Sequence, residues 1–330
     1  LADATGPRGF LHGALGLPAA SFPGYPRTEA LYTHLPGVRR WDSVHPAEGP
    51  LPYPPDDAAL HHVFSDGWMW VLRFNNGLTS AGVSLGSAAA ARLGLAEGAA
   101  AWDRLLAEYP AVARQFQDAH PVRPFIHHAP LAFRSGQAAG PRWIQLATAA
   151  GFLDPLLSTG FPLALLGIQR LASALEAAPG VPDLAPLGEA ALADLDAAAG
   201  LVGALYRVFG DFDTFRELTL LYFAAASFTE TARRLGRPEL APGFLLRGHP
   251  VFGPGLRNVA ADAGSADPGA LRDRIRRLVE PFDVAGLTEE TRGHRHPCLA
   301  ADLFRSAHKL GVDAPAIESM LRRTGFAGAP

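Results

Sequence analysis

The stretch from residue 149 to residue 177 constrains the fold of this 330-residue chain more than any other. It begins AAGFLDPLLSTG over residues 149–160 and continues as an apolar run to about Ala177. Small side chains at 149–151 let a backbone come close to a ligand, and Pro155 restricts Asp154 to an extended turn. The sequence therefore predicts a loop that leads directly into a helix.

This helix is expected to begin near Ser158 and Thr159, which are favourable N-cap residues, and Pro162 suits its first turn. Apolar residues recur with a spacing that predicts a mostly buried helix: Leu163, Leu166, Ile168, Leu171 and Leu175. Its N-terminus would offer free N–H groups and a partial positive charge to an anion, a pyrophosphate or the edge of a reduced flavin. On spacing alone, a core helix without any ligand is the alternative.

The same stretch resembles the GDAAGF-DP-x-x-STG segment of the tryptophan-halogenase-like branch of FAD-dependent monooxygenases. In that family the loop runs past the flavin and the helix N-terminus faces the ring. The resemblance implies cofactor-binding positions at Gly151, Phe152, Asp154, Pro155 and Gly160, and a halide or flavin-edge site at Ser158, Thr159 and Gly160. Two positions depart from the pattern: Ala147-Thr148 replaces the family's Gly-Asp, and Leu157 replaces the acidic residue of the indole halogenases.

Residues 3–6 read DATG and resemble the element that returns the chain to the dinucleotide in FAD-binding Rossmann-like domains. That resemblance adds Asp3, Thr5 and Gly6 to the cofactor-binding positions. No G-x-G-x-x-G occurs between a strand and a helix, and the proline in 253–255 predicts a loop there. We therefore expect that the N-terminal nucleotide-binding part of the family is missing, and that the 330 residues alone bind FAD weakly.

Residues 62–85 carry the strongest strand pattern. Alternating apolar residues occupy 62–64, 68–74 and 78–85, separated by turns, and Asn76-Gly77 is typical of a hairpin. This pattern predicts an antiparallel meander in which Trp68 and Trp70 point to one face. The tract resembles the halogenase W-x-W-x-I-P signature, with Leu72-Arg73 in place of Ile-Pro, and the resemblance implies a substrate pocket. An aromatic core patch is the alternative for the two tryptophans.

The remaining segments complete the expected α/β (α+β) architecture. Further strands are predicted at 31–34, 38–41, 131–134 and 143–146, and helices at 86–120 (with breaks near Gly98 and Pro110), 187–209, 212–235, 271–279 and 298–326. The expected domains are a residual FAD-binding domain (1–9 and 122–178), a substrate domain with an antiparallel sheet (10–121) and a C-terminal helical domain (179–330).

Composition narrows the functional classes. A net charge of -3 gives no basic field for nucleic acid, and no apolar segment is long enough to span a bilayer. The single cysteine, Cys298, allows no internal disulfide and indicates a reducing cytoplasm. His294 and His296 lie beside it, but their spacing and Pro297 do not favour a metal site. Lys309 is the only lysine, so the relay lysine that the halogenases carry in their N-terminal third has no counterpart.

The resemblance as a whole implies an FAD-dependent oxidoreductase of the halogenase or monooxygenase type. It would act on a small organic substrate with reduced flavin and oxygen, and a flavin reductase would be its partner. No residue is assigned as catalytic. Two alternatives stay open: a flavin-dependent reductase of apolar substrates, of the geranylgeranyl type, and a non-catalytic helical binding or interaction protein.

Overall fold

The chain forms two compact units. The computed structural model describes residues 1–178, 180, 182–297 and 299–325. The helical unit comprises residues 1–25, 133–208 and the described part of the chain from 213 onward, and the sheet unit comprises residues 26–132 and 209–212. The division into functional domains expected from the sequence stays a prediction.

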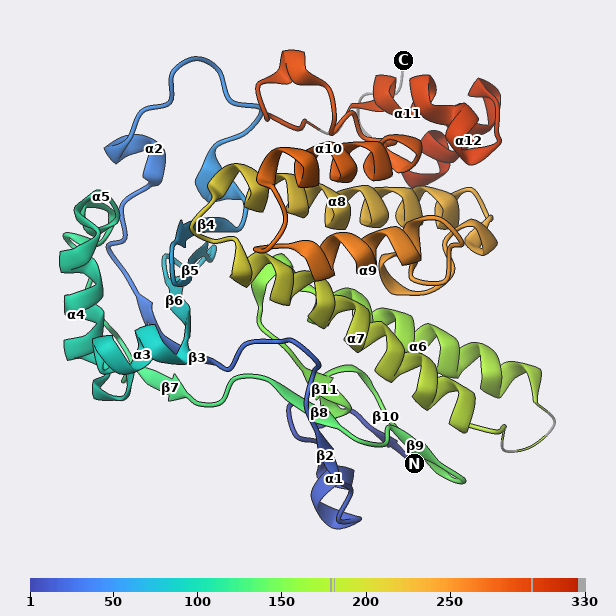
Figure 1. The fold of residues 1–330 in the computed structure, drawn as a ribbon, viewed down its shortest axis with the longest axis horizontal. Helices are drawn as coiled ribbons and strands as arrows, with labels where there is room; N and C mark the ends of the chain where they lie inside the picture. Colours follow the sequence, from blue (N-terminus) through green and yellow to red (C-terminus); the bar gives the residue numbers. More distant parts are fainter. Residues whose placement is uncertain (179, 181, 298, 326–330) are drawn as a thin grey trace. The chain divides into compact units, whose positions relative to one another are not determined.

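Long helices that pack side by side make up most of the helical unit (Figure 1). They are α6 (Gly160–Ala177), α7 (Ala185–Arg207), α8 (Phe212–Arg234), α9 (Phe252–Asp262) and α10 (Pro268–Val279), with the shorter α1 (Phe10–Ala14), α11 (Ala300–Ser306) and α12 (Ala314–Thr324). The predicted helical character of this part of the chain is confirmed. Leu205 of α7 and Leu218 and Leu221 of α8 are completely buried in its core. No described helix is both long and apolar enough to cross a membrane.

Two small sheets in the same unit bring its N-terminal residues beside the 149–160 loop. The first has the order β1 (Ala2–Asp3), β10 (Trp143–Gln145), β9 (Ala139–Gly140), with β1 parallel to β10. The second has the order β11 (Gly151–Phe152), β8 (Phe133–Ser135), β2 (Ala19–Ala20) and is antiparallel. Residues 153–159 then link β11 to α6, which fixes where the candidate site lies.

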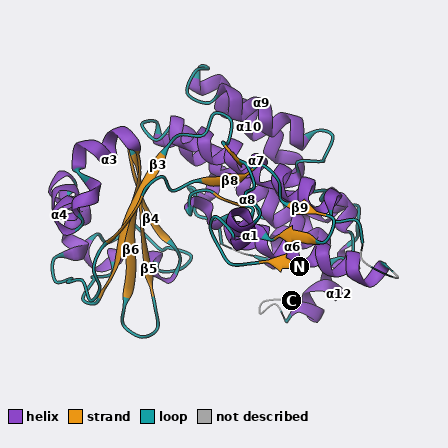
Figure 2. Cartoon of the chain, turned by 90° about the horizontal axis from the view of Figure 1, so that it is seen from below, coloured by secondary structure: helices purple, strands orange, loops and turns teal. Residues whose placement is uncertain are grey.

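The sheet unit contains the predicted antiparallel meander. Its five strands have the order β4 (Leu60–Phe64), β5 (Gly67–Arg73), β6 (Thr79–Gly86), β3 (Thr28–Leu35), β7 (Ile126–His128). Helices α3 (Ser87–Leu93) and α4 (Ala99–Glu108) cover one face of the sheet (Figure 2), and α5 (Pro110–Ala113) follows α4. The core between sheet and helices includes Met69, Val71 and Trp102. The α/β class is therefore confirmed.

Two local predictions are wrong. Residues 38–41 form no strand: α2 (Trp41–Val44) begins there, because the Trp41 amide donates to the buried carboxylate of Asp56 at 2.6 Å and the chain turns instead of extending. Residues 253–255 form no loop but belong to the first turn of α9. Pro254 is tolerated because the first turn of a helix needs no amide donors.

Candidate functional site

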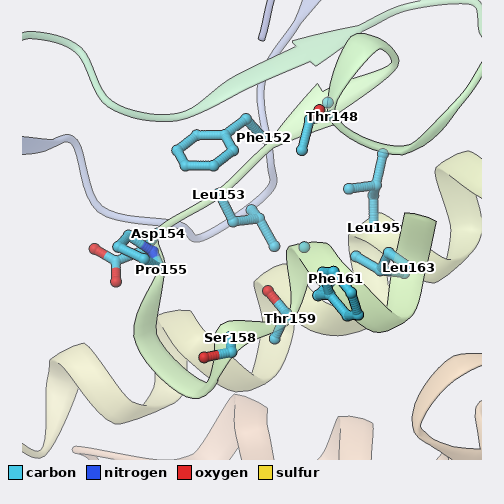
Figure 3. A pocket seen from close by; sticks show the side chains of 12 residues that line it. Thr148, Phe152, Leu153, Asp154, Pro155, Ser158, Thr159, Phe161, Leu163 and Leu195 are labelled. Atoms are coloured by element: carbon cyan, nitrogen blue, oxygen red, sulfur yellow. The ribbon is translucent and has the colours of Figure 1, made fainter. Parts of the chain in front are cut away.

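A pocket of about 220 Å³ lies where the 149–160 stretch enters helix α6. Its lining comes from residues 148, 151–155, 158–161 and 163, together with Leu195 of α7, and Figure 3 shows the labelled side chains around one hollow. The wall is mostly apolar, with Phe152, Leu153 and Phe161 as its largest side chains. Asp154 is the only ionisable group among the described residues that line it.

A strained turn precedes the helix. Leu157 and Ser158 both have positive φ, at 63° and 53°, in a short 3-10 helix (Leu156–Ser158). A non-glycine residue in this left-handed region costs roughly 1–2 kcal/mol. Such strain persists only where the surrounding structure imposes it, and it occurs often at ligand sites. The turn therefore marks this loop as a candidate site independently of its sequence.

Asp154 anchors the loop from inside the protein. Its side chain is 2% exposed, and it accepts hydrogen bonds from the Leu156 amide at 2.8 Å and from the Tyr206 hydroxyl at 2.5 Å. Tyr206 belongs to α7, so the carboxylate ties the loop to that helix. These hydrogen bonds show that Asp154 shapes the pocket, and its assignment to cofactor binding stays a prediction. The sequence offered no signal for Tyr206, which lies 52 residues away.

Helix α6 begins where the sequence predicts. Thr159 is its N-cap residue and is 2% exposed, but its side chain makes no capping hydrogen bond. The Leu163 amide donates to the Thr159 carbonyl at 3.2 Å, so the amides of Gly160 and Phe161 lie ahead of this helical hydrogen bond, and Pro162 has no amide hydrogen. The positive end of an 18-residue helix thus borders the pocket.

The expectation that α6 is mostly buried is wrong. Only Leu163 is fully buried, whereas Phe161 is 73% exposed and Leu165, Ile168 and Leu175 are each more than half exposed. The apolar residues of this helix are spread around its circumference, and α7 covers only one side. Hydrophobic spacing identified the helix but not how much of it would be covered.

The N-terminal DATG stretch lies next to this region. Asp3 pairs with Gln145 across β1 and β10, and the Leu146 amide donates to the Asp3 carbonyl at 2.8 Å. Burial would raise the pKa of the Asp3 carboxyl, but hydrogen bonds from the Leu11 amide and from Thr5 outweigh it and lower that pKa. The Thr5 hydroxyl in turn accepts from the Phe10 amide at 2.8 Å. Asp3 and Thr5 therefore fasten a turn of the chain, and Gly6 adopts φ +91° within it.

The two tryptophans of β5 lie in the sheet unit. Their rings are 5.4 Å apart on one face of the sheet, opposite Met69 and Val71, which pack against the helices. Trp68 is 1% exposed, while Trp70 is half-buried and its indole N–H donates to the Ser80 hydroxyl at 3.4 Å. Their assignment to a substrate pocket stays a prediction.

Comparison with known proteins finds relatives for about half of the chain. No family model matches it. It is 33% identical over 165 residues to monodechloroaminopyrrolnitrin halogenase PrnC of Pseudomonas fluorescens, and 35% identical over 169 residues to tetracycline 7-halogenase of Kitasatospora aureofaciens, in each case over 48% of this chain. Over this part of its length, the chain is similar to two halogenases. These matches span 29% and 30% of the two relatives, so the chain covers less than a third of their length.

A solved structure of the halogenase PltM, in complex with phloroglucinol and FAD, shares the fold of this chain. The TM-score is 0.63 at 23% identity, over 98% of this chain and 63% of PltM. A second PltM structure, in complex with ethyl mercury and mercury, gives a TM-score of 0.67 over 87% of this chain and 64% of PltM. The shared fold therefore extends beyond the half of the chain that the sequence matches cover.

Proposed function

We propose that this chain contributes the flavin-ring and halide site of an FAD-dependent oxidoreductase of the halogenase type. The observation that carries the proposal is the pocket at the start of α6, where the positive end of the helix meets an apolar wall. The identity to two halogenases supports the same assignment. Monooxygenation of a small organic substrate is the alternative oxidation that the same site would support.

The residues present fit one part of FAD and not the other. Gly151 and Gly160 lack side chains at the pocket wall, and Phe152 and Leu153 offer an apolar surface suited to the isoalloxazine edge. The pyrophosphate finds no comparable donors, because the sequence contains no G-x-G-x-x-G and Asp3 and Thr5 already bond to each other and to backbone amides. Gly151, Phe152, Pro155 and Gly160 would therefore hold the ring.

When bound, reduced FAD would supply two electrons to oxygen, and the halide would supply the other two needed to reduce oxygen to water and so become an electrophilic halogen. The residues of the chain have simpler tasks. The Gly160 and Phe161 amides and the Ser158 hydroxyl would hold the halide, assisted by the helix dipole. Asp154 and Tyr206 keep the loop in place, and Phe152 and Leu153 exclude water.

Two further assignments complete the proposal. Trp70 would contact the small organic substrate, with the buried Trp68 packed beside it, and a separate flavin reductase would deliver reduced flavin. Lys309 is not assigned a relay role, because it donates to the carbonyl oxygens of Glu280 and Asp283 within the helical unit. No feature of the pocket specifically favours either alternative, the flavin-dependent reductase of apolar substrates or the non-catalytic binding protein.

The test supplies the purified chain with FAD, an added flavin reductase, NADH and oxygen, and offers a panel of phenols, indoles and pyrroles with and without bromide. Mass spectrometry is expected to detect brominated products that require both bromide and the chain. Hydroxylated products that form without bromide would assign a monooxygenase instead. If no product depends on the chain across the panel, the enzymatic proposal is wrong.

A further inference from the structure

A second cavity, of about 310 Å³, lies in the helical unit between α6, α8 and the short 3-10 helix Phe244–Leu246. Its walls are largely apolar, with Leu165 and Leu166 from α6, Ala225 and Ala226 from α8, and Phe244 opposite them. Small-molecule sites in proteins typically have about this volume and this apolar character, with a few polar groups that orient the ligand. The cavity is therefore large enough for a ligand of its own.

This cavity lies on the opposite side of α6 from the pocket at its N-terminus. Successive helical residues are rotated by about 100°. Gly160, Phe161 and Leu163 line the first pocket, and Pro162, Leu165 and Leu166 line the second. The two sets therefore occupy opposite faces of the helix, and the second cavity is not part of the proposed flavin site.

Arg233 of α8 supplies the positive charge in the wall of the second cavity. It lines the cavity and donates one hydrogen bond to the Gln169 side chain of α6, while its Nε is buried without a hydrogen-bond partner among the described residues. No carboxylate in the described part of the chain forms a salt bridge with it. A buried donor left unsatisfied on a charged group costs free energy, so a ligand that accepts from Arg233 would bind favourably.

The other polar groups favour the same kind of ligand. Glu230 also lines the cavity, but its carboxylate is paired with Arg234 at 2.5 Å and its side chain is 58% exposed, so it is neutralised at the rim. Burial raises the pKa of the Tyr222 phenol, which keeps that hydroxyl a neutral donor. With Thr229, the cavity offers one cation and neutral hydroxyl groups, and no carboxylate available for a cationic ligand.

We propose that this cavity is a binding site for a small amphipathic anion, such as an aromatic carboxylate. The ring lies between Leu165, Ala226 and Phe244, and the carboxylate accepts from Arg233. This assignment does not depend on flavin chemistry.

The test uses 2-naphthoate as the probe and 2-naphthamide as its neutral counterpart, with binding measured by titration calorimetry on the chain without flavin. The wild type is expected to bind naphthoate saturably and at least tenfold more tightly than naphthamide. Arg233→Gln is expected to weaken naphthoate binding about tenfold or more, because a charge-assisted hydrogen bond contributes about 1.5–3 kcal/mol, and to leave naphthamide unchanged. Arg233→Lys should restore part of the preference for the anion.

Two further variants locate the site. Ala226 is exposed at the cavity wall, so Ala226→Trp fills the space without disturbing the core and is expected to abolish binding of both probes. Arg257→Gln, at an exposed position of α9 and outside the cavity, is the control and should bind as the wild type does. The proposal is overturned if the wild type binds neither probe saturably up to about 1 mM. It also fails if naphthoate and naphthamide bind alike, or if Arg233→Gln or Ala226→Trp binds naphthoate like the wild type.

Discussion

At the scale of single residues, the candidate site depends on one buried carboxylate. Asp154 holds the loop to α7 through the Tyr206 hydroxyl and closes the turn through the Leu156 amide. The next residues, Leu157 and Ser158, have left-handed backbone angles that the loop would not adopt without such an anchor. The strain and the anchor together position the start of α6.

Tyr206→Phe tests this anchor. The substitution keeps the ring but removes the hydroxyl that donates to a buried carboxylate, so we expect the free energy of unfolding to fall by about 1–3 kcal/mol. Urea denaturation of the helical unit measures the change. Tyr222→Phe is the control, because the Tyr222 hydroxyl has no hydrogen bond to another described residue, and it should lie within about 0.5 kcal/mol of the wild type. If the two variants are equally stable, the Tyr206–Asp154 hydrogen bond does not anchor the loop.

At the scale of elements, close backbone approach fixes α7 against the small sheet. A Cβ on Gly188 would lie 2.6 Å from the Cβ and 2.9 Å from the amide nitrogen of Ala139 in β9. Gly200, three turns further along α7, would meet nothing within 4 Å. Packing against β9 therefore requires a glycine at position 188, whereas the space around position 200 would accept a larger side chain.

Substituting each glycine by alanine separates these reasons. Gly188→Ala is expected to destabilise the helical unit by about 1–3 kcal/mol, because β9 must shift to make room. Gly200→Ala is expected to stabilise it by about 0.5–1 kcal/mol through the higher helix propensity of alanine. Thermal unfolding of both variants checks the pair, and a stabilised Gly188→Ala would contradict the packing of α7 on β9.

The β4 strand makes the sheet unit sensitive to acid. Burial, with a smaller contribution from His62, lowers the pKa of His61 from 6.5 to about 4. The unfolded chain therefore binds a proton near pH 6.5 that the folded chain does not accept until about pH 4, and stability falls as the pH drops through that window. The neutral His61 side chain thus contributes roughly 3 kcal/mol to the free energy of unfolding. This contribution is fully present above pH 6.5 and is lost by about pH 4.

Denaturation of the sheet unit as a function of pH, followed by tryptophan fluorescence, measures this dependence. His61→Gln should flatten the slope between pH 6.5 and 4, whereas His120→Gln, at an exposed position of the same unit, should retain it. An unchanged slope in His61→Gln would show that other groups cause the acid sensitivity.

The sequence predicted those elements that depend on residues close together in the chain, and failed where distant residues decide the structure. Local signals sufficed for the 62–85 meander and for the start of α6, where alternation and turn residues act within a few positions. Residues 38–41 were mispredicted because the amide of Trp41 bonds to Asp56, 15 residues away. Tyr206 and the exposed face of α6 could not be predicted either, because both depend on how α6 and α7 pack after folding.

At the scale of the whole chain, the two halves of the proposed FAD site are unequally represented. The proposed ring site is a formed pocket, whereas this sequence contains no G-x-G-x-x-G that would present backbone amides to a pyrophosphate. The absence of a few charge-assisted hydrogen bonds, each contributing about 1.5–3 kcal/mol, lowers affinity by several powers of ten.

The 330-residue chain is therefore expected to bind FAD with a dissociation constant weaker than roughly 100 μM. Quenching of flavin fluorescence during titration with the protein measures it. Stoichiometric binding at micromolar concentrations would mean that the phosphates have a site elsewhere in the chain.

The same titration, repeated on Gly160→Ala, tests the location of the flavin most directly. A Cβ at Gly160 would lie 3.8 Å from the Thr148 side chain, so the added methyl group fits the folded chain but occupies the wall of the pocket. If the flavin ring binds at the N-terminus of α6, Gly160→Ala should weaken FAD binding about tenfold, and Gly200→Ala should leave it unchanged. Equal FAD affinities for the wild type, Gly160→Ala and Gly200→Ala would contradict the assignment of this pocket to the flavin.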